Sequence, residues 1–423
     1  GGIHASLYPD EAYVHGSAHA VVKGDGDVAW GRVLTDCANG GPKPLYEGGQ
    51  IEADQFIPAR WDLMPAERYS WASVQTVRGC PKHCSFCSVW RTDGQRPRER
   101  TADPVIKELV ELRRLGFRFI VLADDNFYPV TLKELEQAKE RNNPKRLAEL
   151  QAGRDARFEL MARLAELPKD MVLLTQITME VAEDPEFLDA MHKARILGAL
   201  VGIESVTPEG LKTVYKNFNT TGDNLVRQLQ TFQEHGVHVL GSFIFGLSSD
   251  KPDTFSTTAK LAQDASLAFA QFVTMVPFPG TVDFMNWEKK MESDPTRIAG
   301  FPLTRYWLMP RASRPRLCME HPLMSAEEIR TGTQGVWDSF YSLASAWKRS
   351  GNCARKLRSR LAFVLVSKLF RQMFANVGIA TDSARIKKAT TWAGRLAKLS
   401  QRVFRASPMP ELQVPKGPLT AGE

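Results

Sequence analysis

Three cysteines fall within the nine residues from Gly79 to Cys87, at Cys80, Cys84 and Cys87. A loop this short can aim three thiolates at one place, and Cys thiolates hold iron–sulfur clusters. Because a cubane cluster has four irons, three protein ligands leave one iron open for chemistry. The alternative is zinc, whose structural sites usually add a second Cys or Cys/His pair. No second pair exists here, and His83 is poorly placed to complete the site. The spacing therefore predicts an iron–sulfur cluster, with zinc or chance clustering of buried thiols as alternatives.

Size and composition indicate a globular protein of two or three domains, since the chain has 423 residues, 43% of them hydrophobic and 24% charged. Cys37, Cys318 and Cys353 are isolated, so we expect no disulfide framework. An open cluster needs a reducing compartment. The sequence shows no signal peptide and no run of about 18 apolar residues. We therefore expect a cytoplasmic location.

From Ser73 onward, apolar strands alternate with amphipathic helices. The expected strands are 73–78, 117–123, 170–177, 199–203, 237–245 and 270–276. The expected helices are 101–115, one or two within 132–167, 185–194, 223–235 and 254–265. Repeated β–α units predict a parallel sheet with right-handed crossovers. Six units are too few for an eight-fold barrel, so we predict an α/β fold with a partial (β/α)6 barrel over residues 73–290. The cysteine loop then lies at the carboxyl ends of the strands, where such barrels place their chemistry.

The segments before this core predict a separate small unit. Residues 1–50 have the pattern of the end of an α/β domain, with a helix opened at Pro9. Residues 41–62 are rich in Gly and Pro, which indicates a linker. In the division into domains, we place the linker at residues 51–72. The chain starts at Gly1 without an initiator Met, so we expect a protein truncated at its N-terminus.

The segments after the core predict a helical, basic extension over residues 291–407. Helical patterns occur at 325–346 and 355–374, and the proline-containing residues 408–423 predict a disordered tail. From Lys348 to Arg405 there are fifteen Lys or Arg residues and one acid. The simplest interpretation is a helical cap that exposes its charges. The alternatives are peripheral contact with an anionic membrane and nucleic-acid binding, for which no recognition motif is present.

The loop Cys80-x3-Cys84-x2-Cys87, with Phe86 before the last Cys, resembles the signature of the radical S-adenosylmethionine (SAM) enzymes, and the six β–α units resemble their partial barrel. Further segments resemble the branch that carries an N-terminal cobalamin (B12)-binding domain: 123–127, 175–176, 202–205, 245–247 with Asp250, and 277–281. The resemblance covers roughly residues 1 to 310. Residues 1–50, with Gly24-Asp25-Gly26-Asp27, resemble the C-terminal remnant of that Rossmann-like cobalamin-binding domain. The C-terminal region is similar to that of hopanoid-methylase-like relatives.

This resemblance implies that Cys80, Cys84 and Cys87 ligate a [4Fe–4S] cluster, that SAM chelates the open iron, and that reduction releases a 5′-deoxyadenosyl radical. It further implies cobalamin-dependent methylation of an unactivated carbon, with a radical SAM oxidoreductase or cyclase reaction as the alternative. Because most of the cobalamin domain would precede Gly1, we expect this chain alone to bind cobalamin weakly or not at all. An electron carrier would need all irons ligated, and a zinc-stabilised binding module would not need six β–α units.

Candidate cofactor-binding residues lie in the expected strands or just after them: Gln176, Glu204, Ser205, Ser242, Gly246 and Pro279. An acid that ends a buried strand needs a partner. For Glu204 we expect the SAM amino group or ribose, and the alternative is a rim acid paired with Lys or Arg. For Gln176 the alternative is a core hydrogen bond, for Gly246 a bulge, and for Pro279 an ordinary turn.

Asp124 and Asp125 are adjacent carboxylates after the second expected strand. Neighbouring acids raise each other's pKa, so we predict that one of them handles protons in catalysis. The alternative is a pair of turn and capping residues. The expected partners of the protein are a small-molecule or lipid-like substrate and a reductant such as flavodoxin or ferredoxin.

Overall fold

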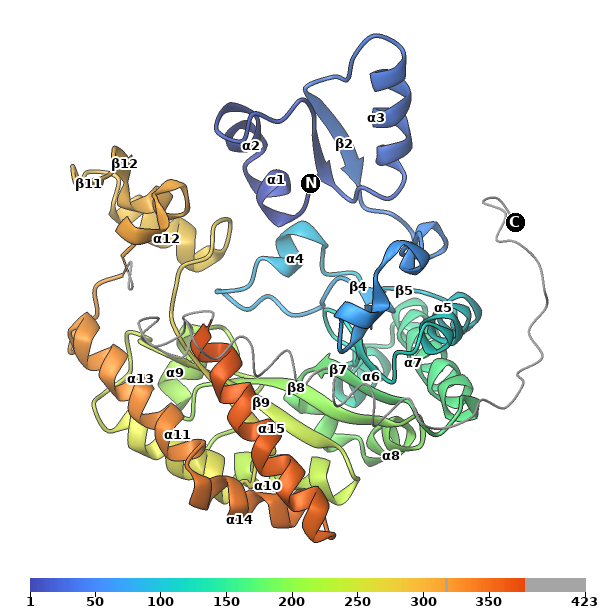
Figure 1. The fold of residues 1–423 in the computed structure, drawn as a ribbon, viewed down its shortest axis with the longest axis vertical. Coiled ribbons are helices and arrows are strands. Elements are labelled where there is room, and N and C mark those ends of the chain that lie inside the picture. Colours follow the sequence, from blue (N-terminus) through green and yellow to red (C-terminus); the bar gives the residue numbers. More distant parts are fainter. Residues whose placement is uncertain (316–318, 377–423) are drawn as a thin grey trace.

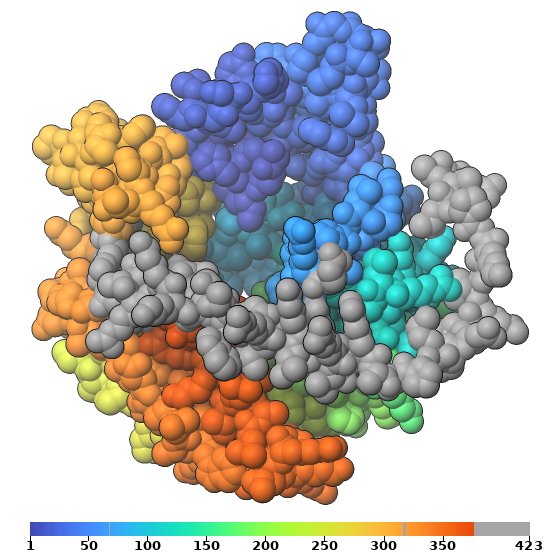
Figure 2. Space-filling view, in the orientation of Figure 1, coloured from blue at the N-terminus to red at the C-terminus, as the bar shows by residue number. Residues whose placement is uncertain are grey.

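The computed structural model describes residues 1–315 and 319–376, and Figure 1 shows their arrangement. A six-stranded parallel sheet flanked by helices forms the body, and a smaller α/β unit made by the first fifty residues lies at one end. Figure 2 shows this unit rising from the same side of the body as the region around α12. The tail predicted for residues 408–423 and the last part of the predicted basic extension lie outside the described residues.

The sheet confirms the predicted partial barrel. Its strand order is β3-β6-β7-β8-β9-β10, and every pair of neighbours is parallel. The strands span Ala72–Val74 (β3), Phe119–Leu122 (β6), Val172–Ile177 (β7), Ile196–Glu204 (β8), His238–Phe245 (β9) and Phe269–Thr274 (β10). Because parallel strands are joined by crossovers, all six carboxyl ends meet at one edge. The cysteine loop follows β3 at that edge.

The crossover helices match the sequence pattern. They span Ala102–Arg114 (α5), Leu132–Glu140 (α6), Pro144–Glu166 (α7), Pro185–Lys193 (α8), Pro208–Thr213 (α9), Gly222–Glu234 (α10) and Thr254–Asp264 (α11), with a 3-10 turn at Met179–Glu183 (η4). Their starts follow local chemistry. Thr131 and Glu134 form a capping box at α6, and Asn143 and Asp184 cap α7 and α8, each ahead of a proline.

The N-terminal unit is a two-stranded parallel sheet with its own small core. Its elements are Ile3–Leu7 (α1), Pro9–Val14 (α2), Val21–Gly24 (β1), Ala29–Ala38 (α3) and Leu45–Gly49 (β2). Residues 45–49, part of the Gly- and Pro-rich stretch that indicated a linker, form β2 instead and lie inside the 1–50 unit of the predicted domain division. Tyr46 buries its ring against Val22 and Val33 and donates its hydroxyl to Asp36 at 2.7 Å, which Gly and Pro content does not reveal. Three 3-10 turns follow at Ala53–Gln55 (η1), Trp61–Leu63 (η2) and Ala66–Arg68 (η3).

The strand predicted at residues 73–78 is interrupted. After β3, the chain forms β4 (Val77–Arg78), which pairs antiparallel with β5 (Arg98–Glu99) as the neck of the cysteine loop. A short helix at Val89–Thr92 (α4) lies inside this loop. The N–H groups of Thr76 and Val77 donate to Asp124, so they are not available to a neighbouring strand.

The C-terminal region begins with short elements and continues as helices. It comprises Val282–Lys290 (α12), Arg297–Ile298 (β11), Phe301–Pro302 (β12), Leu303–Leu308 (η5), Arg311–Ser313 (η6), Ala326–Phe340 (α13), Leu343–Cys353 (α14) and Leu357–Asn376 (α15). Trp337 and Tyr341 hydrogen-bond to backbone groups of β10, and Phe363 and Phe370 of α15 pack on Phe269 with ring centroids 5.4 and 5.1 Å away. Within the described ranges, no helix combines the length and the apolar character needed to cross a bilayer.

Candidate active site at the carboxyl edge of the sheet

The cysteine loop is shaped in part by backbone hydrogen bonds between its own residues. The Cys80 N–H donates to Gly94 O at 3.1 Å, and the Cys87 N–H donates to Cys84 O at 3.2 Å. Gly79 has a φ of 93°, and a side chain there would place Cβ 2.8 Å from the carbonyl oxygen of Arg96. A glycine is thus required at the point where the chain turns into the loop.

The three thiols of the loop lie close enough to influence one another electrostatically. Burial raises the pKa of Cys80 to about 11 and that of Cys84 to about 12, and it also raises the pKa of Cys87. Backbone N–H groups of Lys82 and Val89 point at the sulfurs of Cys80 and Cys87 and lower those pKa values. Such N–H···S bonds are among the contacts that tune thiolate-bound clusters.

No three His, Cys, Asp or Glu side chains in the part of the chain that the structure describes are placed to hold a single metal ion. A cubane cluster asks for a different arrangement, because its three Cys ligands bind three different irons. The shared location of the buried thiols and the N–H donors around them fit such a cluster.

A buried ion pair lies beside Cys84. Lys216 Nζ contacts Glu204 Oε1 at 2.9 Å and donates to Gly202 O at 2.8 Å, and both charged residues are buried. Although burial opposes it, the Glu204 carboxylate raises the pKa of Lys216, and the Cys84 sulfur adds to this effect. Glu204 has a φ of 65°, beside a register shift between β8 and β9. A left-handed backbone of this kind is uncommon for a residue with a side chain and is found most often at functional sites.

Sequence reasoning missed Lys216 as the partner of Glu204. The alternative interpretation of Glu204, a rim acid paired with Lys or Arg, describes the observed contact. Lys216 lies after α9, in a segment with no motif of its own, and Asn219 from the same segment also donates to Gly202 O. The available signal was only that a buried acid demands a cation nearby.

Asp124 and Asp125 both bind the base of the cysteine loop. Asp124 is fully buried and accepts bonds from the N–H groups of Thr76 and Val77 and from the Thr76 hydroxyl. Asp125 accepts from the Gly79 N–H at 2.7 Å, and burial raises its pKa to about 6. These contacts are those of anchoring groups, as in the turn-and-cap alternative. The catalytic assignment of both acids stays a prediction.

The remaining candidates have different surroundings, and Ser242 lies within β9 rather than at its end. Gln176 is exposed and donates to Asp124 O at 3.2 Å, while Ser242 accepts from Gln271 at 2.9 Å. The Ser205 hydroxyl accepts from the Thr207 N–H, so it belongs to the turn before α9.

Two of the candidates belong to loops after strands. Gly246 has a φ of 85° and donates its N–H to Asp250 at 2.8 Å. Pro279 is half-buried in the turn ahead of the Thr281 cap of α12. Gly246 and Pro279 therefore lie in the loops that follow β9 and β10. The cofactor-binding roles of all six candidates stay predictions.

A family model described as the radical SAM superfamily matches residues 74–262. This range includes the cysteine loop and the complete strands β6, β7, β8 and β9. Residues 74–262 have the signature of a radical SAM domain. Enzymes of this superfamily use a [4Fe–4S] cluster and SAM. The α/β fold and the recognition of this family from the cysteine spacing are confirmed.

Relatives of the radical SAM domain include two kinds of enzyme. The chain is 29% identical over 203 residues to the hopanoid C-2 methylase of Rhodopseudomonas palustris, covering 47% of this chain and 34% of that protein. It is 24% identical over 324 residues to the anaerobic magnesium-protoporphyrin IX monomethyl ester cyclase of Rubrivivax gelatinosus, covering 69% and 53%. The chain thus spans between a third and about half of the length of these relatives.

The fold is also similar to that of a solved structure, the radical SAM methyltransferase TsrM from Kitasatospora setae with cobalamin and a [4Fe–4S] cluster bound. The TM-score is 0.60 at 17% identity, over 87% of this chain and 80% of that one. In the present chain, the N-terminal unit lines a cavity of about 480 Å3 with Val28, Gly31, Arg32, Thr35, Asp36, Lys43 and Tyr46. This lining contains no histidine, so we assign none of these residues as a ligand of a cobalamin cobalt.

Proposed function

We propose that this chain binds a [4Fe–4S] cluster through Cys80, Cys84 and Cys87 and cleaves SAM reductively. The observation that carries the proposal is the placing of three mutually interacting thiols at the carboxyl edge of a six-stranded parallel sheet, beside the Lys216 ammonium. When bound and reduced by one electron, the cluster and SAM supply a 5′-deoxyadenosyl radical, which abstracts hydrogen from a substrate.

Lys216 is the group we propose to orient SAM. A buried ammonium beside the cluster thiols complements the carboxylate of an amino acid, and Glu204 complements an amino group. The Cβ position of Gly202 would lie 2.2 Å from Glu204 Oε1 and 2.5 Å from Lys216 Nζ. The absence of a side chain at this position therefore allows the pair to sit over the end of β8. Both charges stay within reach of a ligand at Cys84.

We propose an apolar substrate that reaches the inner face of the sheet. The side chains on this face follow from register, because Leu174 pairs with Gly198, and Leu200 with Leu240. Leu174, Leu200 and Leu240 are only partly buried, although they lie within the sheet. Phe269, the next residue in this row, packs against α15. An apolar face that ends near polar Ser242 and Gln271 suits a largely hydrophobic molecule with few polar groups.

We also propose that α15 contacts a membrane surface peripherally, from which an apolar substrate would reach the site. Leu361, Leu365 and Val366 are 56%, 47% and 48% exposed, and Arg358 is exposed on the same helix. Apolar and basic side chains on one exposed helix suit an anionic lipid surface. Cosedimentation with phosphatidylserine vesicles, but not phosphatidylcholine vesicles, tests this contact. Unchanged sedimentation of the double variant L361E/L365E would refute it.

The reaction we propose after hydrogen abstraction is cobalamin-dependent methylation of an unactivated carbon, in which methylcobalamin would supply the methyl group, with cyclisation or oxidation without methyl transfer as the second candidate. The hopanoid methylase supports the first and the magnesium-protoporphyrin cyclase supports the second. A flavodoxin or ferredoxin is the proposed electron donor, and the need for a reducing compartment supports the expected cytoplasmic location.

Anaerobic reconstitution tests the proposed function. The protein is treated with iron and sulfide, then with dithionite and SAM, and 5′-deoxyadenosine is measured. We expect product from the wild type and from Cys37→Ala, since Cys37 is exposed on the N-terminal unit, and none from Cys84→Ala. Bound zinc without 5′-deoxyadenosine in the wild type would refute the proposal. Product from Cys84→Ala would refute the ligand assignment.

A further inference from the structure

The cysteine loop has a neck that is electrostatically incomplete by itself. Its two strands, β4 and β5, are two residues long each, and their register places Arg78 directly opposite Arg98. Like charges in directly opposed positions destabilise a strand pair, and an isolated two-stranded hairpin is marginal in water. The neck therefore needs a compensating anion from elsewhere in the chain.

Asp25 of the N-terminal unit supplies this anion. Its Oδ1 contacts Arg78 Nη1 at 2.8 Å and its Oδ2 contacts Arg98 Nη1 at 2.6 Å, so one carboxylate joins both strands of the neck. The Ile51 N–H also donates to Oδ2 at 2.9 Å, and Asp27 adds a second contact to Arg78 at 2.9 Å. Two cations and two anions balance here.

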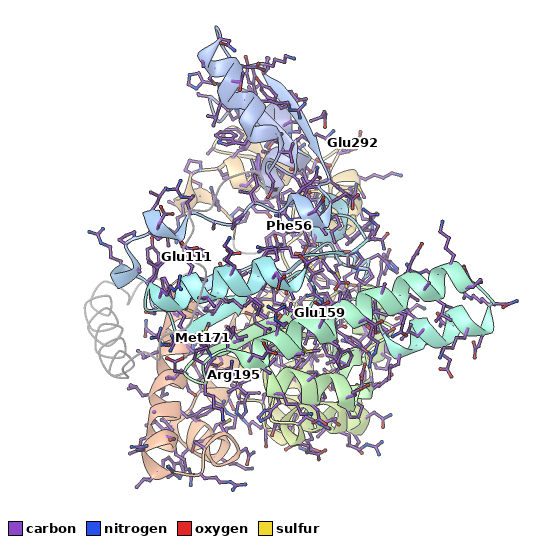
Figure 3. The ribbon with its side chains drawn as sticks, turned by 90° about the vertical axis from the view of Figure 1, so that its right-hand side faces the viewer. Phe56, Glu111, Glu159, Met171, Arg195 and Glu292 are labelled. Atoms are coloured by element: carbon purple, nitrogen blue, oxygen red, sulfur yellow. The ribbon has the colours of Figure 1, made fainter. Side chains whose placement is uncertain are left out.

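The surroundings of the contact make it strong. The side chains of Asp25 and Arg98 are 8% and 2% exposed, and ion pairs with so little access to water are weakly screened. The Arg78 guanidinium also lies 4.5 Å from the ring centroid of Phe56, which Figure 3 labels at the junction between the N-terminal unit and the body. Burial opposes ionisation of Asp25, but the bonds from Arg98 and Ile51 hold its pKa below the ordinary value.

We propose that Asp25 is a positioning residue for the cluster loop, which clamps the Arg78–Arg98 neck and thereby sets the place of Cys80 and the thiols that follow. Arg78 is separated from Cys80 only by Gly79, whose N–H donates to Asp125. A shift of the neck is therefore passed directly to the first cluster ligand. The Gly-Asp-Gly-Asp turn of the N-terminal unit has its use in this contact with the radical SAM domain.

The test compares D25N with a matched control, E52Q. Glu52 also contacts the loop, through Arg96 at 2.5 Å, but this pair is 62% and 69% exposed and worth little. Amide hydrogen exchange on the anaerobic apo chain is measured by mass spectrometry. In D25N we expect exchange of peptides from residues 77–99 to rise about tenfold or more, with β8 and β9 unchanged and E52Q like the wild type. Unchanged exchange at 77–99, or an equal rise throughout the chain, would overturn the proposal.

The second arm uses the reconstituted protein and rests on the proposed function. We expect D25N to retain less than about half the iron of the wild type or to show an altered EPR signal of the reduced cluster, and D25E to recover part of the loss. Full iron content and an unchanged signal in D25N would overturn the positioning role. If the wild type itself takes up no iron, the proposed function fails while the exchange experiment still decides this inference.

A double-mutant cycle keeps the proposal testable if D25N folds poorly. Asp27 contacts only the Arg78 side of the neck and is partly exposed, so D27N is the milder variant. The double variant D27N/R78M should lose less stability than the sum of the two single variants. The reason is that Arg78, which Arg98 repels, is removed together with its partner Asp27. Additive costs would overturn the clamp.

Discussion

Replacing Arg157 by Met provides a stringent test of how the base of the cysteine loop is held. Arg157 lies on α7 with a fully buried side chain, donates to the Thr76 hydroxyl at 2.8 Å, and contacts Glu99 Oε2 at 2.5 Å. It also offsets the charge of Asp124, which has no access to solvent. The substitution keeps much of the volume but leaves two buried carboxyl groups without their cation.

The magnitude follows from the cost of neutralising a carboxyl group. Each pH unit corresponds to about 1.4 kcal/mol. Protonating a group with an ordinary pKa of 3.8 at pH 7 therefore costs about 4 kcal/mol, which agrees with the roughly 3–5 kcal/mol lost when one partner of a buried pair is removed. The control is R163M on the same helix. Arg163 contacts Asp103 at 2.7 Å, but the two side chains are 39% and 80% exposed, so we expect a loss of about 0–1 kcal/mol.

Urea unfolding of the anaerobic apo chain, followed by circular dichroism, measures both losses. Burial already raises the pKa of Asp124 and of Glu99, and losing Arg157 raises both further. An acid with a raised folded pKa destabilises the fold increasingly as pH rises above its unfolded pKa. The deficit of R157M should therefore be larger at pH 8 than at pH 5. A loss equal to that of R163M, or one independent of pH, would refute this reasoning.

Three further substitutions test the site. Burial raises the pKa of Asp250 from 3.8 to about 6, so ionising this buried acid destabilises the fold as pH rises through this range. In D250N, the amide oxygen can keep both backbone bonds without a charge. Thermal melts should show D250N to be about 3 kcal/mol more stable than the wild type at pH 8 and almost equally stable near pH 4. K216M should weaken SAM binding about tenfold to a hundredfold in equilibrium dialysis, while K212M, an exposed control, should not. G202A should weaken binding similarly, because its Cβ would displace the pair formed by Lys216; equal binding by G202A and the wild type would contradict the proposed subsite.

The sequence predicted those parts of the fold that follow from local pattern. The apolar run at residues 117–123 became β6 because Ile120 and Leu122 are fully buried between the sheet and its helices. Thr131 and Glu134 placed the start of α6 through a capping box that is visible as residue types three positions apart. Such signals depend only on neighbours in the chain, so they survive without knowledge of the tertiary fold.

Contacts between distant segments were not predictable in this way. Glu204 and Lys216 are twelve positions apart across α9, and Asp25 meets Arg98 across 73 positions. Nothing in the local pattern distinguishes Arg98 from the other basic residues around it. The break after β3 has the same origin, because the N–H groups of Thr76 and Val77 are captured by an acid that lies at the end of another strand.

The way the loop is held gives the acids around its base a structural role in the scaffold. Between β4 and β5 the described chain forms only the four-residue helix α4 as regular structure, so the loop cannot fix the orientation of its thiols by itself. Asp25, Asp124 and Asp125 all contact its base, and each carboxylate accepts bonds from residues that precede Cys80. Open-iron chemistry needs accurate placing of the ligand that completes the iron. In this molecule, Asp25, Asp124 and Asp125 hold the residues that lead into Cys80, and a catalytic role for Asp124 or Asp125 stays a prediction.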